Sequence, residues 1–155
     1  MDKFDVAILS RLQTDCSVSL NDLAEEVMLG STACWRRMQK LEETGYIRGR
    51  VAVLDRKKLN VGVSVFVSVS TSQHNQAWID KFHETVSEIP EVVEVYRMAG
   101  ETDYLMRVVV PDIEAYDGVY KRLIQVPGLS DVNSAFAMEQ IKYTTELPLK
   151  YVKQG

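Results

Sequence analysis

The sequence is poor in the residues that form metal centres. It contains two cysteines and two histidines among 155 residues, and the spacing of Cys16 and Cys34 is not that of zinc ligands. Cys34 falls on an apolar helical stripe, which indicates packing in a core. Cys16 falls in a loop, where we interpret it as a free thiol. We therefore expect no metal site and no cofactor.

Long apolar runs and catalytic motifs are also missing. No segment approaches the ~20 apolar residues that a membrane-spanning helix needs, and the chain does not begin with the basic and apolar stretches of a leader. No nucleophile stands beside a base, and no glycine-rich loop is placed to cradle phosphate. These absences predict a cytoplasmic protein that is not an enzyme and does not interact with membranes.

Charge is distributed unevenly along the chain. The net charge is −4, yet residues 36–58 hold eight basic and only three acidic side chains. Residues 1–60 have a net charge of +1, and residues 61–155 have a net charge of −5. A basic cluster on an acidic protein indicates a surface for a polyanion such as DNA. The acidic second half is not expected to contact nucleic acid.

The basic cluster overlaps a segment with the pattern of a helix-turn-helix. Ser19 and Asp22 have the spacing of a capping box at a helix start, and apolar residues follow at helical intervals. After a break at residues 28–30, a second helical stripe contains Cys34, Met38 and Leu41. An earlier helix over residues 2–14, a cap at Gly45 and a two-stranded wing at residues 46–54 that turns at Gly49 complete a winged helix-turn-helix.

The outward face of the second helix and the wing carry cations and amides. Arg and Gln contact base edges, whereas Arg and Lys also neutralise phosphates. The alternative is a helical bundle with a solvated charged face, but the local concentration of positive charge favours DNA. The predicted DNA-binding residues are Ser31, Thr32, Trp35, Arg36, Arg37, Gln39, Lys40, Arg48 and Arg50.

The second half of the chain has a different periodicity. Valine occupies every second position from Val61 to Val69, which indicates a strand with one buried face. The predicted order is strand, helix, strand, strand, helix, strand, with residues 141–147 extending the sheet. This βαββαβ order predicts a ferredoxin-like domain. The other face of the first strand (Ser64, Phe66, Ser68 and Ser70) is semi-polar, so we expect a second copy to cover it.

Residues in both halves resemble the Lrp/AsnC (feast/famine) family of transcriptional regulators. The resemblance covers nearly the whole chain, and the order and spacing of its motifs make it specific. In the first half it lies in Ile8–Asp15, Leu23–Val27 and Cys34–Ile47. In the second half it lies in Gly100–Met106, Pro111–Tyr116 and Pro127–Gly128. The tail at Ser134–Pro148 is similar to family members that handle aliphatic or sulfur-containing amino acids.

The resemblance implies a two-domain sensor of the α+β class. It implies a DNA-binding domain at residues 1–54, a linker at 55–60, and a ferredoxin-like domain at 61–155 that dimerises, forms higher oligomers up to octamers and binds a free amino acid. The implied effector-binding residues are Met98, Gly100, Glu101, Thr102, Asp103, Ser134, Ala135 and Phe136. Glycine permits close backbone approach to a carboxylate, and Glu101 or Asp103 can pair with an ammonium. The alternative for Asp103 is a bond to the backbone of a turn.

The chain departs from the family pattern at two positions. Met28 stands where a small or turn-forming residue is usual, and Gly30 lacks a side chain to cap the second helix, so Ser31 is a second candidate for the cap. Neither departure changes the expected fold. The apolar Met98, Ala135 and Phe136 favour leucine, methionine or cysteine over a charged effector. The alternative function is an architectural DNA-binding protein without a metabolite response, which the net acidity disfavours.

Overall fold

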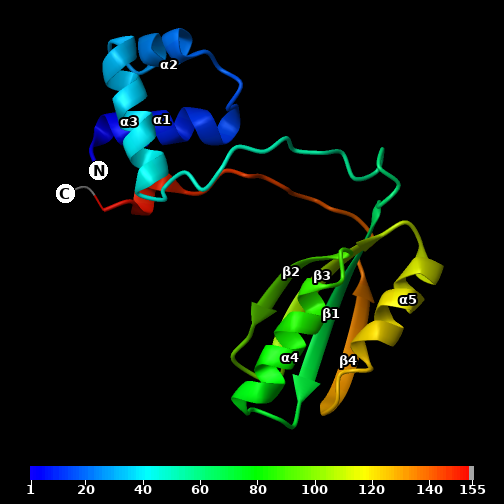
Figure 1. The fold of residues 1–155 in the computed structure, drawn as a ribbon. Helices are drawn as coiled ribbons and strands as arrows, with labels where there is room; N and C mark the ends of the chain where they lie inside the picture. The colour runs from blue at the N-terminus through cyan, green and yellow to red at the C-terminus, as the bar shows by residue number, and fades with distance from the viewer. Residues whose placement is uncertain (154–155) are drawn as a thin grey trace. The chain divides into compact units, whose positions relative to one another are not determined.

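Two units of structure are present in the computed structural model, which describes residues 1–153. One unit combines the segment up to Val53 with the segment from Ile141 onward, and the other comprises Leu54–Gln140. In Figure 1 the first unit contains both the blue helices and the red C-terminal segment. The chain therefore leaves the first unit after Val53 and returns to it at Ile141.

Three helices pack around a small apolar core in the first unit. They are α1 (Lys3–Thr14), α2 (Leu20–Glu26) and α3 (Ser31–Glu43). The buried side chains come from all three helices and from the turn between the last two: Ile8, Leu23, Ala24, Val27, Cys34, Met38 and Leu41. This core confirms the predicted helix-turn-helix and the predicted packing role of Cys34.

Side chains cap the first two helices but not the third. Asp2 forms a capping box with Asp5 at the start of α1, and the Ser19 side chain accepts a hydrogen bond from the Asp22 amide at the start of α2. Gly30 caps α3 without a side-chain hydrogen bond. The second candidate for that cap, Ser31, is wrong because its hydroxyl donates to the Asn21 side chain at 2.8 Å.

Two residues with positive φ frame α3. Met28, in the turn before the helix, has φ 55°, so it occupies the left-handed conformation for which the family uses a small or turn-forming residue. Gly45, after the helix, has φ 77°, and the Ile47 amide beyond it donates to the Leu41 carbonyl at 3.0 Å. The predicted glycine cap is confirmed.

The predicted two-stranded wing is not formed in the described chain. Residues 46–54 contain no strand, and Gly49 makes no hairpin turn. An isolated two-stranded hairpin is marginally stable, and this segment lacks the Asn-Gly or Asp-Gly pair that would fix its turn. The segment is extended, with Val51 and Val53 exposed.

The C-terminal segment belongs to the first unit and does not extend the sheet. Residues 141–147 are not in a strand, contrary to the prediction, and a 3₁₀ turn follows at Leu149–Tyr151. Gln13 in α1 holds this segment through three hydrogen bonds. Its side chain donates to the Leu147 carbonyl at 3.2 Å and accepts from the Leu147 amide at 2.9 Å, and its carbonyl accepts from Thr145 Oγ1 at 3.1 Å.

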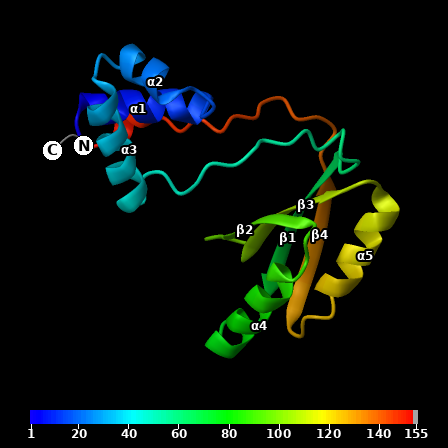
Figure 2. The same ribbon diagram turned by 45° about the horizontal axis from the view of Figure 1, so that its top comes forward.

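The second unit is a four-stranded antiparallel sheet with two helices on one face (Figure 2). Its elements, in chain order, are β1 (Val63–Thr71), α4 (Gln76–Ser87), β2 (Val92–Arg97), β3 (Tyr104–Val110), α5 (Ile113–Leu123) and β4 (Leu129–Phe136). The strand order is β2-β3-β1-β4, and every neighbouring pair is antiparallel. This is the predicted ferredoxin-like arrangement.

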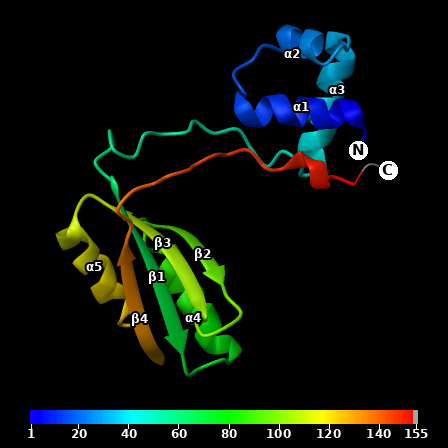
Figure 3. The same cartoon turned by 180° about the vertical axis from the view of Figure 1, so that it is seen from behind.

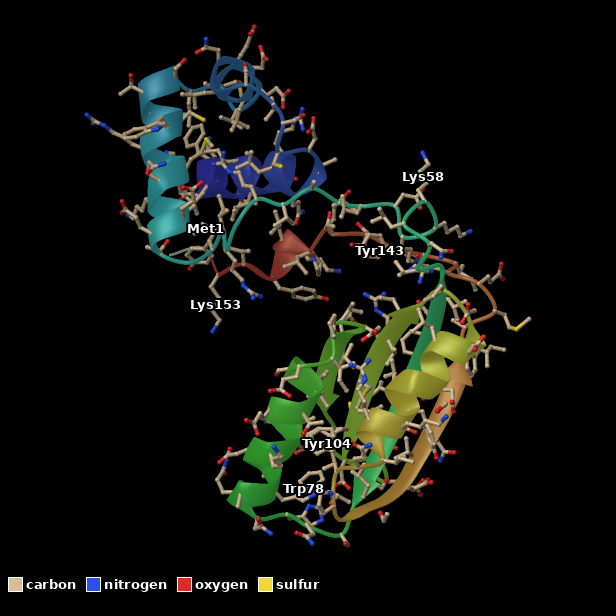
Figure 4. The ribbon with its side chains drawn as sticks, turned by 45° about the vertical axis from the view of Figure 1, so that its right-hand side comes forward. Met1, Lys58, Trp78, Tyr104, Tyr143 and Lys153 are labelled. Atoms are coloured by element: carbon tan, nitrogen blue, oxygen red, sulfur yellow. The ribbon has the colours of Figure 1, made fainter. Side chains whose placement is uncertain are left out.

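Side chains in β1 point alternately to a buried face and to an open face of the sheet. Val65, Val67 and Val69 are fully buried with the aromatic cluster of Trp78, Phe82 and Tyr104, two of which are labelled in Figure 4. The opposite face is seen from behind in Figure 3. It carries exposed Phe66 and the ion pair between Arg107 and Glu94 at 2.6 Å. The predicted semi-polar face is therefore present.

The segment before β1 is more ordered than the predicted linker at 55–60 suggests. The Asp55 side chain accepts from the Lys57 amide at 2.9 Å, and the Val61 amide donates to the Arg56 carbonyl at 2.9 Å. The Arg56 guanidinium also donates to Ser64 Oγ.

In the part of the chain that the structure describes, no helix has the length and apolar character to cross a membrane.

Candidate DNA-binding and effector-binding sites

The outer face of α3 is a basic and aromatic surface on a firmly packed helix. Cys34, Met38 and Leu41 bury the inner face. The helical period consequently turns Thr32, Trp35, Arg36 and Lys40 outward, where all are exposed. Trp35 is a large apolar side chain at 51% exposure, and Arg36 and Lys40, which lie one helical turn apart, add positive charge beside it. This combination suits contact with bases and phosphates.

Arg37 is directed toward α1 rather than outward with Arg36. Its Nη1 atom lies 2.7 Å from Asp5 Oδ1 and 2.8 Å from Asp2 Oδ2, and its guanidinium lies 5.4 Å from the ring centroid of Phe4. The hydrogen bond to Asp5 raises the pKa of Arg37, and the amide of Asp5 lowers the pKa of Asp2. Arg37, which the sequence placed among the DNA-binding residues, therefore joins α3 to the start of α1.

The other predicted DNA-binding residues differ in their surroundings. Gln39 is partly buried and lies 3.5 Å from Glu42, which is a weak hydrogen bond at most. Arg50 forms an ion pair with the same Glu42, whereas Arg48 is exposed. Arg48 and Arg50 remain on the segment that follows α3, although that segment is not a β-hairpin.

The loop that joins β2 to β3 holds five of the predicted effector-binding residues together. The Met98 amide donates to the Asp103 carbonyl at 2.8 Å, and the Asp103 amide donates to the Val69 carbonyl at 3.0 Å. Gly100 has φ 141°, a conformation that only glycine readily adopts. Ser70 Oγ donates to the Glu101 carbonyl at 3.2 Å.

The Asp103 carboxylate also has a role in the fold. Its Oδ2 atom accepts a hydrogen bond from the Thr71 amide at 2.8 Å, which ties the start of β3 to the end of β1. The alternative that the sequence allowed for Asp103 was a bond to the backbone of its own turn, whereas the observed bond joins Asp103 to the neighbouring strand β1. A carboxylate has acceptor sites for more than one donor, so this bond leaves capacity for an ammonium group.

The three predicted residues on β4 do not face the same side of the sheet. Ser134 and Phe136 pair with Val67 and Val65 on the helix-covered face, whereas Ala135 pairs with Phe66 on the open face. Within a single chain these three residues therefore do not line one pocket with the loop, because side chains alternate along a strand. Phe136 is also displaced from the loop, which meets β1 at Val69, by about 13 Å along the strand.

Tyr116 in α5 is the partner of both helix-facing residues on β4. Its hydroxyl is hydrogen-bonded to Ser134 Oγ, and its ring lies edge-on to Phe136 with 5.4 Å between the centroids. Burial raises the pKa of Tyr116, so the phenol is neutral. In the sequence, Tyr116 is singled out only as the last residue of the motif Pro111–Tyr116, and no local pattern identifies its polar partner.

The first unit also contains a groove that the sequence did not predict. Its volume is about 710 Å³, and it is lined by residues of α1, of segment 46–53 and of the C-terminal segment. Most of the lining is apolar, as in Leu12, Ile47, Val51 and Leu147. Its walls come from segments separated by about ninety residues in the sequence, so no local motif could have revealed it.

Two family models match the chain. The AsnC-type helix-turn-helix domain matches residues 1–42, and the Lrp/AsnC ligand binding domain matches residues 64–147. Together they cover α1, α2 and all but the last residue of α3, and the sheet domain from the second residue of β1 onward, including the loop between β2 and β3.

Similar proteins of known sequence or structure span nearly the full chain. The DNA-binding transcriptional activator DecR of Escherichia coli (strain K12) is 52% identical over 151 residues, which make up 97% of this chain and 99% of DecR. A crystal structure of an AsnC family transcriptional regulator from Agrobacterium tumefaciens has a TM-score of 0.95 and 59% identity, and covers 99% of this chain and 100% of that one. A transcriptional regulator of Neisseria meningitidis in complex with L-Met has a TM-score of 0.93 and 33% identity, with 99% of each chain covered.

Proposed function

The chain belongs to the Lrp/AsnC family of transcriptional regulators, and we propose that it binds a specific DNA sequence and alters that binding in response to a free amino acid. The observation that carries this proposal is the contrast between the two faces of α3. One face is buried in the core, and the other presents Trp35, Arg36 and Lys40 to solvent. A rigid helix with such a face fits the major groove of DNA.

The residues on this surface have different roles in the proposal. Arg36 reads base edges because it is exposed in the middle of α3, and Gln39 assists it from the next turn. Arg48 and Arg50 contact phosphates, so they contribute to affinity without selecting a sequence. Arg37 positions α3 against α1 and does not touch DNA.

The effector site is proposed at the loop between β2 and β3. The backbone at Gly100 is open to close approach, so main-chain amides can bind the carboxylate of an amino acid. Glu101 and Asp103 supply negative charge for its ammonium group. Met98, which is exposed beside the loop, supplies an apolar contact. The remaining wall comes from a second copy of the chain, since Ser134 and Phe136 lie on the helix-covered face.

We favour a small apolar or sulfur-containing effector, namely leucine, methionine or cysteine. A second charge on the effector would have to be buried beside Met98 without a partner, which is costly. The L-Met complex of the Neisseria meningitidis relative supports this choice, although another relative, from Zymomonas mobilis, is described as a glutamate uptake regulatory protein.

The proposed active form is at least a dimer. Phe66 and Tyr96 are exposed on the open face of the sheet, around the ion pair between Arg107 and Glu94. A second copy that covers this face through two-fold symmetry buries the same residues on both sides. Two recognition helices then meet half-sites about 10 bp apart or at multiples of that distance.

A thermal-shift screen of the twenty amino acids tests the effector proposal. A ligand at 100 times its Kd stabilises the folded state by about 2.7 kcal/mol, which is readily detected. We expect a response to leucine, methionine or cysteine and none to lysine or glutamate. Tight binding of a charged amino acid and of none of these three would refute the proposed effector class.

Asp103→Asn tests the placement of the site. The amide oxygen of asparagine still accepts from the Thr71 amide, so the fold is kept while the negative charge is removed. The variant should lose its ligand response and keep ligand-free DNA binding. Asp117→Asn, on the exposed surface of α5, is the matched control and should respond normally. A normal response of Asp103→Asn would move the site elsewhere.

A further inference from the structure

The chain contains two tryptophans, and their surroundings differ. Trp78 is buried in the sheet domain, where its ring stacks on Phe82 with 5.2 Å between the centroids and its indole N–H donates to the Pro127 carbonyl. Trp35 on α3 is 51% exposed. Among residues 1–153, no aromatic ring or cation stacks on Trp35, and its indole N–H has no hydrogen-bond partner. The free protein therefore leaves much of this ring in water.

The helical period divides the outward face of α3 into a charged side and an uncharged side. At about 100° per residue, Arg36 and Lys40 fall on the side nearest α1, to which Arg37 is bonded. Thr32 and Trp35 fall on the opposite side. That side carries no charge in the first two turns of α3, so its largest chemical feature is the indole ring.

Trp35 lies in the part of α3 that reaches deepest into a groove. It is the fifth residue of the helix, and recognition helices contact base edges with their N-terminal residues. Side chains on a helix lean toward its N-terminus, which carries the indole ring over the turn at Thr32. Cys34 is fully buried beside it, so the backbone that holds the ring is fixed. The ring is therefore placed to reach bases rather than phosphates.

We propose that Trp35 determines sequence specificity by packing its indole ring against the 5-methyl group of thymine in the major groove. The inference rests on the proposed function and deepens it, because it names the base chemistry that one side of α3 reads. The methyl group is the apolar feature of a thymine edge, whereas the acceptors of guanine suit the guanidinium of Arg36. The two sides of α3 thus read different bases.

The size of the effect follows from the methyl group. Burying one such group strengthens binding about fourfold. Deoxyuridine lacks the methyl group of thymine but keeps its hydrogen-bonding groups, so replacing a contacted thymine with deoxyuridine should weaken binding by that factor. The salt dependence of binding should stay the same in a Trp35 variant, because no phosphate contact is removed.

Paired changes in the protein and in the DNA test the assignment. The full-length protein first selects its sites from a randomised duplex library, and the thymines of the tightest site are then replaced singly with deoxyuridine. Fluorescence anisotropy gives the affinity of the unsubstituted protein, Trp35→Ala and Trp35→Gln for each duplex. At least one replacement should weaken binding of the unsubstituted protein about fourfold. Both variants should bind the selected site more weakly and be indifferent to that same replacement.

Two control variants separate the methyl contact from a general loss of binding. Arg36→Ala lies on the charged side of α3, so it should bind more weakly and still show the full deoxyuridine effect. Ile113→Ala, on the exposed surface of α5, should keep both the affinity and the deoxyuridine effect. Thermal unfolding of each variant verifies that the protein is folded, and Trp35→Gln keeps a long side chain of good helix propensity.

The other outcomes contradict the proposal. An undiminished deoxyuridine effect in both Trp35 variants would show that another residue reads the methyl group. Absence of the effect at every thymine in the unsubstituted protein, or a selected site without thymine, would show that no methyl group is read. Equal losses of affinity for selected and unrelated DNA would make Trp35 a nonspecific contact.

The selection step separates this inference from the proposed function. A protein that enriches no sequence from the library would refute sequence-specific binding and the inference together. A protein that enriches a sequence but shows no deoxyuridine effect that depends on Trp35 would refute the inference alone.

Discussion

Arg36 and Arg37 are neighbours in α3, but replacing each with alanine should affect a different property of the protein. Arg36→Ala should reduce DNA specificity, and Arg37→Ala should reduce stability. Arg36 is exposed on the outer face. Loss of a base contact costs roughly 1–3 kcal/mol, which corresponds to about a 5- to 140-fold weaker affinity for the specific site. Binding to unrelated DNA should change much less, so the ratio of specific to nonspecific affinity should fall in Arg36→Ala.

Arg37→Ala should instead reduce the stability of the first unit. The side chain makes two short contacts with Asp2 and Asp5, but it is 31% exposed, so solvent screens the ion pairs. A loss of about 1 kcal/mol, at the upper end of the range for exposed pairs, is expected. The contact with Phe4 adds a smaller amount. A change of this size lowers Tm by about 4–8 °C in a unit of this length.

Two measurements on the unsubstituted protein, Arg36→Ala and Arg37→Ala distinguish these roles. Fluorescence anisotropy with specific and scrambled DNA at several salt concentrations gives the specificity ratio, and thermal unfolding gives Tm. Arg37→Lys retains the positive charge and should recover part of the stability. The reasoning is refuted if Arg37→Ala loses the specificity ratio as fully as Arg36→Ala while its Tm is unchanged.

Three further changes test the backbone and the open face of the sheet. Met28→Asn should stabilise the protein by about 1 kcal/mol in urea unfolding, because asparagine tolerates positive φ and Met28 is 86% exposed. Gly45→Ala should destabilise by about 1–2 kcal/mol through backbone strain alone, since an added Cβ would meet no atom within 4 Å; an unchanged midpoint would contradict this. The hydrogen bond from Arg107 lowers the pKa of Glu94 below its usual 4.5, so its contribution to stability is present above that value and is lost as pH falls through the lowered folded pKa. Glu94→Gln should therefore remove part of the stability difference between about pH 6 and about pH 3.

The elements that the sequence predicted correctly are those with strong local signals. The valine alternation identified β1 and its buried face, and the helical stripe of Cys34, Met38 and Leu41 identified the orientation of α3. The cap at Gly45 followed from a conformation that glycine alone readily adopts. Each of these signals lies within about fifteen residues of sequence. The residues that the pattern predicts to be buried are buried in the structure.

The features that the sequence did not reveal depend on contacts between distant segments. Residues 141–147 have the composition of a strand, and only the hydrogen bonds of Gln13 show that they join α1 instead. Arg37 is as basic as Arg36, and its direction depends on where α1 begins. Ser134 and Ala135 are adjacent in the sequence, but the register of β4 against β1 places them on opposite faces.

The return of the chain to its first unit also affects how the protein is made. The three helices emerge from the ribosome early, yet Gln13 can bond to Leu147 only after the whole sheet domain has been synthesised. Local helical contacts form quickly, whereas contacts between segments this far apart form late. Until then the apolar groove lacks one wall, and a nascent chain exposes Leu12 and Ile47 to chaperones or to other chains. The DNA-binding unit is therefore the first unit to be synthesised and the last to be completed.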